Sequence, residues 1–394
     1  MLRTLKDIKD LANKTVIMRV DFNVPLKKVD HTVQDDTRIK EVIPTIRYLQ
    51  KQGAKIILMS HLGRPEGEIV EDMRLKPVAE VLSEILNEKV QYCPEIISDE
   101  ITKTAQNLKA GEIMLLENLR FDPREEMNDE NFAKSLAGLA DIYVNDAFGT
   151  AHRAHASTAG ITAFLPAYAG LLMEKEITML SEALEANQSP VVLIVGGAKI
   201  DGKIGVIEKF IDKADYILVG GGIANTFMYA QGNFIGDSLF QMDKKPLALE
   251  IIELAKAKGK KLIIPQDVAV ALDINEPAQV RKITEIASEE KIFDIGPDTI
   301  AQFDEIISTA KTIIWNGPVG LYEIEAFSSG TKSIAQAIAR NPNCKSYVGG
   351  GDSVDAIHRF KVDESKFTHV STGGGASLEF LQGKTLPGIQ VLMS

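Results

Sequence analysis

The sequence predicts an α/β protein with two domains, each built on a parallel sheet covered by helices, joined by a helical hinge. Short β-branched runs alternate with amphipathic stretches, and the alternation starts again after a helical stretch near the middle of the chain. Such alternation is typical of parallel sheets whose crossover connections are helices. No Gly/Ser-rich linker separates the halves, which favours a helical joint. We therefore place the domains at 1–170 and 189–383, with the hinge at 171–188.

The elements of the first half follow from local pattern. Short runs rich in β-branched residues predict strands at 15–22, 55–60, 112–117 and 141–145. Amphipathic periodicity predicts helices at 37–52, 75–86 and 130–139. Pro44 lies inside the first of these helices, where a proline removes a backbone hydrogen bond and disturbs the helix.

The second half repeats the pattern after a helix expected at 171–186. Strands are expected at 191–195, 216–219, 262–264, 312–315 and 347–348, with helices between them. The chain has 394 residues, of which 45% are hydrophobic and 25% charged. This is the balance of an ordinary globular protein of two or three domains.

Charge and composition exclude several classes of protein. The 44 Lys and Arg residues against 55 Asp and Glu give a net charge of −11, which argues against a nucleic-acid or membrane-surface partner, since both need a broad cationic face. The first fourteen residues are too charged for a signal peptide, and no apolar run is long enough to span a bilayer. Only two cysteines occur, so we expect a reducing, cytoplasmic location.

Arginine is distributed unevenly. Nine of the twelve arginines lie in the first 170 residues. Because a guanidinium group binds carboxylate and phosphate through paired hydrogen bonds, an arginine-rich half could hold a small, multiply charged anion. Chance and surface solubility are the alternative explanation of the count.

Several expected strands of the second half end in glycines. The segments are VLIVGGAK, ILVGGGIANT, IIWNGPVG, YVGGGDS and HVSTGGGAS. Glycine after a parallel strand lets backbone amides approach a ligand, and the following helix N-terminus favours an anion. A single such loop could be an ordinary tight turn, but five in one domain predict a site for a nucleotide or polyphosphate at the carboxyl ends of the strands.

Two common nucleotide motifs are not satisfied. GAKIDGK at 197–203 matches the start of a phosphate-binding loop, but Ile204 stands where Ser or Thr should bind magnesium. No G-x-G-x-x-G occurs, which counts against a dinucleotide-binding dehydrogenase. Asp352, which follows three glycines, could bind magnesium through its carboxylate or could instead cap a helix.

Polar residues of the first half gather near the ends of its expected strands. They lie in RVDFNVP, DDTRI, SHLGRP, ENLRF and DAFGTAHRAHAS. Each has an ordinary structural alternative, such as a turn for an aspartate or a buried position for a histidine. The histidines at 152 and 155 have no accompanying ligands at zinc spacing, and no G-x-S-x-G occurs. Together, the arginines and histidines predict an anion site on one face of the domain.

The motifs taken together resemble those of a known family. RVDFNVP, DDTRI, SHLGRP, ENLRF, NDAFGTAHRAHAS, GGAKIDGKI, WNGPVGLYEIEAF, GGGDS and STGGGASLE occur in this order from Arg19 to Glu379, and they resemble the phosphoglycerate kinase family. The resemblance implies two Rossmann-like domains and reversible, in-line phosphoryl transfer from 1,3-bisphosphoglycerate to ADP, which gives 3-phosphoglycerate and ATP. It also implies a glycolytic, Mg²⁺-dependent enzyme whose lobes close about a hinge, and we expect a monomer.

The resemblance assigns roles to residues that match the family motifs. The triose-binding residues would be Asp21, Asn23, Arg38, His61, Arg64, Arg120 and Arg153 in the N-terminal domain. The nucleotide-binding residues would be Gly196, Gly197, Lys203, Gly220, Gly221, Gly222, Gly296, Asn316, Pro318, Glu323, Gly350, Gly351, Asp352 and Ser353. Asp352 would meet Mg²⁺. The groups facing the transferred phosphoryl group would be Arg38, Lys199, Gly373, Gly374 and Gly375. Residues 384–394 would pack on the N-terminal domain.

One position departs from the family pattern. Gly202 stands where the family usually has Asp immediately before the second lysine of GGAKIDGKI, while Lys199 and Lys203 keep their spacing. Two other classes share the architecture, namely a nicotinamide dehydrogenase and a non-catalytic hinged binding protein. Magnesium-dependent formation of ATP separates all three.

Overall fold

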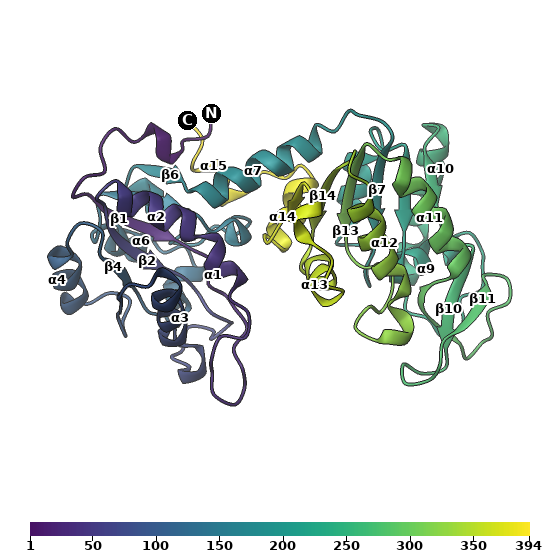
Figure 1. Ribbon diagram of the computed structural model, residues 1–394, viewed down its shortest axis with the longest axis horizontal. Helices are drawn as coiled ribbons and strands as arrows, with labels where there is room; N and C mark the ends of the chain where they lie inside the picture. The colour runs from purple at the N-terminus through teal and green to yellow at the C-terminus, as the bar shows by residue number, and fades with distance from the viewer. The chain divides into compact units, whose positions relative to one another are not determined.

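The computed structural model describes residues 1–394, which divide into two compact units (Figure 1). Unit 1 comprises Met1–Thr178 and Thr385–Ser394, and unit 2 comprises Met179–Lys384. The boundary falls inside helix α7 (Leu171–Leu184), so the chain passes from one unit to the other within a helix. The expected fold class, two parallel-sheet α/β domains, is confirmed.

Unit 1 is built on a six-stranded parallel sheet in the order β3-β4-β2-β1-β5-β6. Its strands are β1 (Thr15–Arg19), β2 (Lys55–Met59), β3 (Val90–Tyr92), β4 (Ile113–Leu115), β5 (Ile142–Asn145) and β6 (Ala167–Ala169). Its other helices are α1 (Thr37–Glu41), α2 (Ile43–Lys51), α3 (Lys76–Leu86), α4 (Asp99–Asn107), α5 (Pro123–Glu126), α6 (Glu130–Ala137) and α15 (Pro387–Gln390). Strands β3 and β6 were not predicted.

Alternation along each strand explains how the sheet is covered. Val16 and Met18 of β1 share one hydrophobic cluster with Ile46 of α2 and Leu82 of α3. The intervening residues of β1 point to the opposite face of the sheet, because side chains alternate along a strand. Both faces are buried, which is the usual state of a parallel sheet.

The strand order of unit 1 fixes where a ligand can bind. Strands β2, β3 and β4 lie on one side of β1, and the later strands β5 and β6 lie on the other side. Open α/β sheets bind ligands beyond the carboxyl ends of the strands, at the point where successive strands change from one side of the sheet to the other. In unit 1 that point lies between β1 and β5.

Unit 2 contains a second parallel sheet, in the order β15-β14-β13-β7-β8-β9. Its strands are β7 (Val191–Val195), β8 (Tyr216–Val219), β9 (Lys261–Ile263), β13 (Thr312–Asn316), β14 (Lys345–Gly349) and β15 (His369–Val370). Its helices are α8 (Ile204–Phe210), α9 (Gly221–Ala230), α10 (Lys245–Ala257), α11 (Pro297–Thr309), α12 (Ser329–Arg340), α13 (Gly351–Arg359) and α14 (Gly375–Leu381). Strands β8 and β9 lie on one side of β7, and the later strands β13, β14 and β15 lie on the other, so the change of side falls between β7 and β13.

An antiparallel sheet in unit 2 was not predicted. It consists of β10 (Asp267–Ala271), β11 (Gln279–Lys282) and β12 (Lys291–Ile295), in the order β11-β10-β12. Strand β11 is exposed over most of its length and carries two basic residues, so it lacks the apolar run that marks a strand. Figure 1 shows β10 and β11 at the edge of unit 2.

Proline divides the helix expected at 37–52. The structure has α1 up to Glu41 and α2 from Ile43, with Pro44 in the first turn of α2. A proline there needs no hydrogen-bond donor, whereas in a continuous helix it would clash with the carbonyl group of Lys40. The expected strand at 15–22 likewise ends earlier, at Arg19.

The two ends of the chain meet in unit 1 (Figure 1). Leu2 forms an antiparallel bridge with Met393, and the Arg3 side chain donates a hydrogen bond of 2.8 Å to the carbonyl oxygen of Val391. Gly388 is so close to Ala151 that a Cβ atom would lie 2.9 Å from the Ala151 Cα atom. These contacts explain why Thr385–Ser394 belong to unit 1.

Candidate functional site

In unit 1, polar side chains surround His61, which follows β2 and is 4% exposed. Its Nδ1 atom lies 3.1 Å from Nη2 of Arg19 and 3.9 Å from Oδ1 of Asp21. Burial lowers the pKa of His61 well below its usual value, and the nearby positive charges lower it further. Those charges belong to Arg19, Arg120, Arg153 and Arg38. Four guanidinium groups thus converge on one imidazole.

Arg38 reaches this group from α1, across the end of β1. Its Nη1 atom donates to Oδ2 of Asp21 at 2.9 Å and to the carbonyl oxygen of Asn23 at 3.4 Å. The Asn23 side chain accepts a hydrogen bond of 2.9 Å from the backbone N–H of Gly63. Asp21 and Asn23 therefore fix the loops after β1 and β2 together and orient Arg38.

Arg120 and Arg153 differ in how their charges are balanced. Arg120 is buried, donates to the Gly63 carbonyl oxygen at 2.7 Å and pairs with Glu126 at 3.0 Å. Burial is the main cause that lowers the pKa of Arg120. Arg153 donates to Nε2 of His152 at 3.2 Å and forms no ion pair, so its positive charge remains available to an anion.

Among the predicted triose-binding residues, Arg64 has the fewest contacts that would fix its side chain. Its side chain is exposed and forms no ion pair, although the neighbouring Gly63 contacts both Asn23 and Arg120. The other predicted triose residues, Asp21, Asn23, Arg38, His61, Arg120 and Arg153, lie together. Their role in binding stays a prediction.

A buried network behind this cluster was missed by the sequence analysis. Arg19, 1% exposed, donates to Oγ of Ser157 at 2.9 Å, and Ser157 donates both its hydroxyl and its N–H to the carboxylate of Glu125. Burial raises the pKa of Glu125, and the charge of Arg19 opposes the rise. The available signal was a charged residue at the end of a largely apolar strand, TVIMR.

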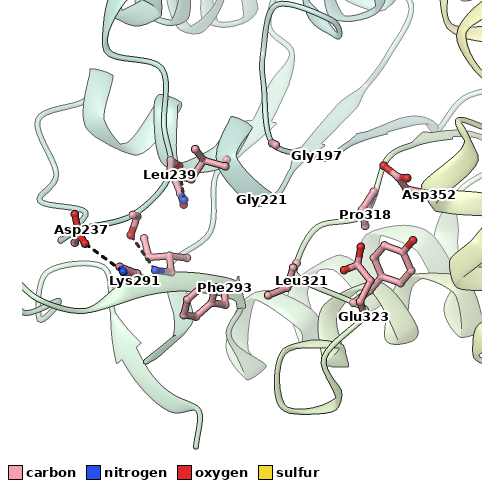
Figure 2. Close-up of a pocket in the computed structure, with 17 residues that line it drawn as sticks. Gly197, Gly221, Asp237, Leu239, Lys291, Phe293, Pro318, Leu321, Glu323 and Asp352 are labelled. Atoms are coloured by element: carbon pink, nitrogen blue, oxygen red, sulfur yellow. Dashed lines mark hydrogen bonds and ion pairs between the residues drawn. The ribbon is translucent and has the colours of Figure 1, made fainter. Parts of the chain in front are cut away.

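In unit 2 a cavity of about 550 Å³ opens among the glycine turns (Figure 2). Of the predicted nucleotide residues, it is lined by Gly197, Gly221, Gly222, Pro318, Glu323 and Asp352. The remaining lining residues, not predicted, include Asn225, Leu239, Ile292, Phe293, Leu321 and Tyr322. Their apolar wall comes partly from β12, an element whose existence the sequence pattern did not indicate.

Close backbone packing explains other glycines of the predicted set. A Cβ atom on Gly196 would lie 2.0 Å from the carbonyl oxygen of Pro318, and one on Gly220 would lie 2.2 Å from Cβ of Val319. Gly296 is buried against Asp267, whose carboxylate already accepts hydrogen bonds from the first turn of α11. These three glycines do not line the cavity.

Asp352 stands free at one side of the cavity. It lies in the first turn of α13, whose cap position is Gly350, and its carboxylate accepts no hydrogen bond. The helix-capping alternative is therefore not what the structure has. No group of three or more His, Cys, Asp or Glu side chains could hold a metal ion. Asp352 alone suits a magnesium ion that also binds phosphate oxygens, because Mg²⁺ often takes one protein carboxylate together with substrate phosphates.

Lys203 and Asn316 lie together near Asp352. Nζ of Lys203 donates to Oδ1 of Asn316, and burial lowers the pKa of Lys203 to about 8, against the raising effect of Asp352. Nδ2 of Asn316 is buried without a partner. Gly350 has φ of 90°, a backbone conformation that residues with a side chain rarely adopt, so glycine is favoured in this turn.

The remaining predicted residues lie on loops around this region. Ser353 is buried and accepts a hydrogen bond of 2.7 Å from the N–H of Gly317, which is a structural contact. Lys199 is exposed and forms no ion pair. Gly351 begins α13, and the run Gly373, Gly374 and Gly375 begins α14, with φ of 54° at Gly374.

The loop that carries Lys199 and Lys203 is held in place by residues from another part of the chain, Gln241 and Lys244. Gln241 accepts a hydrogen bond of 2.6 Å from the N–H of Ile200 and donates one of 2.7 Å to Asp201, which also pairs with Lys244 at 2.8 Å. Nothing lies within 4 Å of a Cβ atom built on Gly202. A side chain at this position would therefore meet open space.

Two parallel α/β sheets, a cluster of arginines and a glycine-bounded cavity with a free carboxylate are typical of two-domain α/β proteins that bind small anionic ligands. A sequence model of phosphoglycerate kinase matches residues 5–384. Phosphoglycerate kinase of Dictyoglomus turgidum is 52% identical over 99% of this chain and 98% of its own, and that of Herpetosiphon aurantiacus is 50% identical over the same shares.

Solved structures agree with the sequence comparison. Phosphoglycerate kinase from Coxiella burnetii has a TM-score of 0.89 at 43% identity and covers 100% of this chain and 99% of its own. The enzyme from Pyrococcus horikoshii has a TM-score of 0.85 at 36% identity, with 100% and 98% covered.

The chain belongs to the phosphoglycerate kinase family. It is a phosphotransferase with a carboxyl group as acceptor, a kinase of glycolysis that binds ATP and acts on small molecules. None of its helices has the length and apolar character needed to cross a membrane.

Proposed function

We propose that this chain transfers a phosphoryl group from 1,3-bisphosphoglycerate to ADP, reversibly and in line, to give 3-phosphoglycerate and ATP. The observation that carries the proposal is the convergence of four arginines on His61 in unit 1. Asp21 and Glu126 pair with two of these arginines, and the positive charge that remains, chiefly that of Arg153, suits a small phosphorylated acid. The glycine-bounded cavity of unit 2 supports the nucleotide part of the proposal.

In this proposal unit 1 holds the triose. Arg153, which has no carboxylate partner, and the exposed Arg64 are the groups whose charges are available for the substrate phosphate. Asp21 and Asn23 orient Arg38, which would neutralise charge on the transferred phosphoryl group. No general base is required, because a carboxylate or ADP oxygen is already ionised when it attacks.

Unit 2 would hold the nucleotide in the cavity beside Gly197, Gly221 and Pro318. Asp352 would hold Mg²⁺, which when bound neutralises the negative charge on the phosphates. Lys203 and the buried Nδ2 group of Asn316 offer further donors near this end of the cavity. Lys199 and the amides of Gly373, Gly374 and Gly375 would face the moving phosphoryl group, where donors stabilise the transition state.

The test is formation of ATP from 1,3-bisphosphoglycerate and ADP by the purified chain, with and without Mg²⁺. Arg38→Ala should lower turnover about 10²–10³-fold, because removal of one preorganised donor has that effect. Its affinity for MgADP, measured by calorimetry, should stay near that of the unchanged protein, since Arg38 belongs to unit 1.

Arg47→Ala is the matched control. Arg47 lies in α2 of the same unit and pairs with Glu88 on the surface, so its loss should leave turnover unchanged. A normal rate for Arg38→Ala, or an equal loss in both variants, would contradict the assigned role. We further propose that the enzyme is a monomer, since one chain carries both groups of site residues, and that it is cytoplasmic, since the chain has only two cysteines.

A further inference from the structure

Segment 317–323 forms part of the wall of the unit 2 cavity and is joined to helix α13 by hydrogen bonds. Pro318, Tyr322 and Glu323 line the cavity from this segment, and Asp352 lines it from the first turn of α13. Figure 2 shows Pro318, Glu323 and Asp352 on the same side of the cavity. The residues proposed for the nucleotide and for magnesium thus come from two elements, and their relative position depends on the contacts between these elements.

A hydrogen bond between two side chains joins the segment to the helix. Tyr322 is 5% exposed, and its hydroxyl donates a hydrogen bond of 2.8 Å to Oδ2 of Asp355 on α13. Burial raises the pKa of the Tyr322 hydroxyl, and the hydrogen bond to Asp355 raises it further. The hydroxyl therefore keeps its proton and stays a donor. Hydrogen bonds to a charged carboxylate are about twice as strong as those between neutral groups.

Two further hydrogen bonds join the same elements at the ends of the segment. Oγ of Ser353 accepts one of 2.7 Å from the N–H of Gly317. The Arg359 side chain donates one of 3.2 Å to the carbonyl oxygen of Glu323. Arg359 lies about one helical turn after Asp355, so two successive turns of α13 hold two successive residues of the segment.

Like charge opposes this arrangement. Asp352 and Asp355 are three residues apart on α13, so their side chains are neighbours on one face of the helix. The charges of both carboxylates, and that of Glu323, act on the Tyr322 hydroxyl and raise its pKa. Negative charges that act on the same hydroxyl also repel one another. The hydrogen bond from Tyr322 therefore opposes the separation of segment and helix that this repulsion favours.

We propose that Tyr322 is a positioning residue for the magnesium nucleotide: by holding Asp355, it fixes Glu323 and Asp352 relative to each other before the nucleotide binds. The inference rests on the proposed nucleotide site and adds to it a hydroxyl group that acts through its neighbours. An arrangement that is fixed in advance favours binding, because less order has to be gained when the ligand arrives.

The test compares Tyr322→Phe with the unchanged chain. The variant keeps the ring that lines the cavity and loses only the hydroxyl. Its dissociation constant for MgADP, measured by calorimetry, should be about fivefold larger, because a hydrogen bond to a charged group no longer holds the free site in order. The KM for MgATP should rise with it. Turnover at saturating MgATP and the KM for 3-phosphoglycerate should stay within about twofold, since the lost contact affects nucleotide binding alone.

Tyr347→Phe is the matched control. Tyr347 lies in β14 of the same unit, is 2% exposed and donates its hydroxyl to Oε2 of Glu182 at 3.1 Å, but it does not line the cavity. Each variant loses one hydrogen bond from a tyrosine to a carboxylate, so the urea midpoint should fall in both. The dissociation constant for MgADP should change in Tyr322→Phe and not in Tyr347→Phe.

Asp355→Ala tests whether Tyr322 acts through Asp355. In this background the change Tyr322→Phe should alter the dissociation constant for MgADP by less than about twofold, because the acceptor of the hydroxyl is already absent. The comparison within one background also cancels the effect of the lost carboxylate charge on the affinity for an anion. Asp355 is exposed, so its replacement should leave the fold intact.

Three results would overturn the inference: an unchanged dissociation constant in Tyr322→Phe, an equal increase in Tyr347→Phe, or the full effect of Tyr322→Phe in the Asp355→Ala background. Failure of the unchanged chain to bind MgADP would instead refute the proposed nucleotide site, and the inference with it.

Discussion

The charge of His61 is set by its surroundings. Burial and four neighbouring guanidinium groups keep its pKa well below the usual value, so the ring is neutral at pH 7. Nδ1 faces Nη2 of Arg19 at 3.1 Å, and a guanidinium group can only donate. Nδ1 is therefore the acceptor and Nε2 carries the hydrogen. His61 is thus a neutral N–H donor among charged arginines.

We predict that Lys203 makes the affinity for nucleotide dependent on pH. Burial lowers its pKa to about 8, so in the free protein it loses its proton as the pH rises through 8. Bound phosphate favours the charged form and raises this pKa, so binding is coupled to proton uptake above pH 8. We expect the dissociation constant for MgADP, measured by calorimetry, to increase roughly tenfold between pH 7 and pH 9.

Lys203→Arg provides the control for this pH effect. A guanidinium group stays charged through this range, so the profile of the variant should be flat between pH 7 and pH 9 whatever its absolute affinity. The assignment to Lys203 fails if both proteins show the same increase, or if neither does.

At the level of single residues, a position directly after an expected strand was a useful sequence signal for candidate site residues. It indicated Asp21, Asn23 and His61, which the structure places together. It could not separate a glycine that leaves room for a ligand, such as Gly197, from one that leaves room for backbone, such as Gly196, because both follow the same strand. That distinction depends on contacts with a segment more than 100 residues away.

A buried carboxyl group, that of Asp146, caps the N-terminus of helix α7. Oδ1 of Asp146, which directly follows β5, accepts hydrogen bonds from the N–H groups of Leu172 at 2.9 Å and Met173 at 3.1 Å, while Oδ2 is buried without a partner. Burial raises the pKa of Asp146 to about 7, and Glu41 contributes in the same direction. The helix that passes from one unit to the other is thus capped by a group that titrates near neutrality.

Asp146 should make the folded state less stable as the pH rises. Between about pH 4 and pH 7 the folded protein holds a proton that the unfolded chain releases, so the contribution of this group to the free energy of unfolding falls through that range. Asp146→Asn keeps an oxygen acceptor for the cap and cannot ionise. The urea midpoint of the unchanged chain should therefore fall relative to this variant from pH 5 to pH 8.

Comparison of the unchanged chain with Asp146→Asn separates the effect of Asp146 on stability from the effects of other groups that titrate in the same pH range. His61 and His155 have lowered pKa values and contribute in the opposite sense, but equally in both proteins. Asp146→Ala removes the cap altogether and should be less stable by about 0.5–2 kcal/mol at every pH. A pH dependence identical in Asp146→Asn and the unchanged chain would rule out the assignment.

Most elements of the two parallel sheets could be predicted, because strands buried on both faces read as apolar runs. Strands β3 and β11 were not predicted, the first because its three residues, VQY, include a polar one and form no apolar run, and the second because its side chains are largely exposed. The missed sheet contributes to the cavity, since Ile292 and Phe293 of β12 form part of its wall. The apolar side of the cavity was therefore less predictable than its glycine turns.

At the scale of the whole molecule, the return of Thr385–Ser394 to unit 1 has no local signal. It depends on contacts such as that between Gly388 and Ala151, which are more than 200 residues apart in the chain. The sequence analysis obtained it only from the family resemblance. The division into two α/β units, in contrast, followed from a pattern that restarts after α7.

The two groups of site residues belong to different units, and this leads to the last prediction. The arginine cluster belongs to unit 1 and the glycine-bounded cavity to unit 2, yet a phosphoryl group can pass only between atoms in contact. Water must also be excluded, because an acyl phosphate hydrolyses readily. We therefore expect small-angle scattering to give a smaller radius of gyration with 3-phosphoglycerate, Mg²⁺ and a non-transferable ATP analogue together than for the free chain. Each ligand alone is the control and should give a smaller change, and the absence of any compaction in the ternary complex would refute closure about α7.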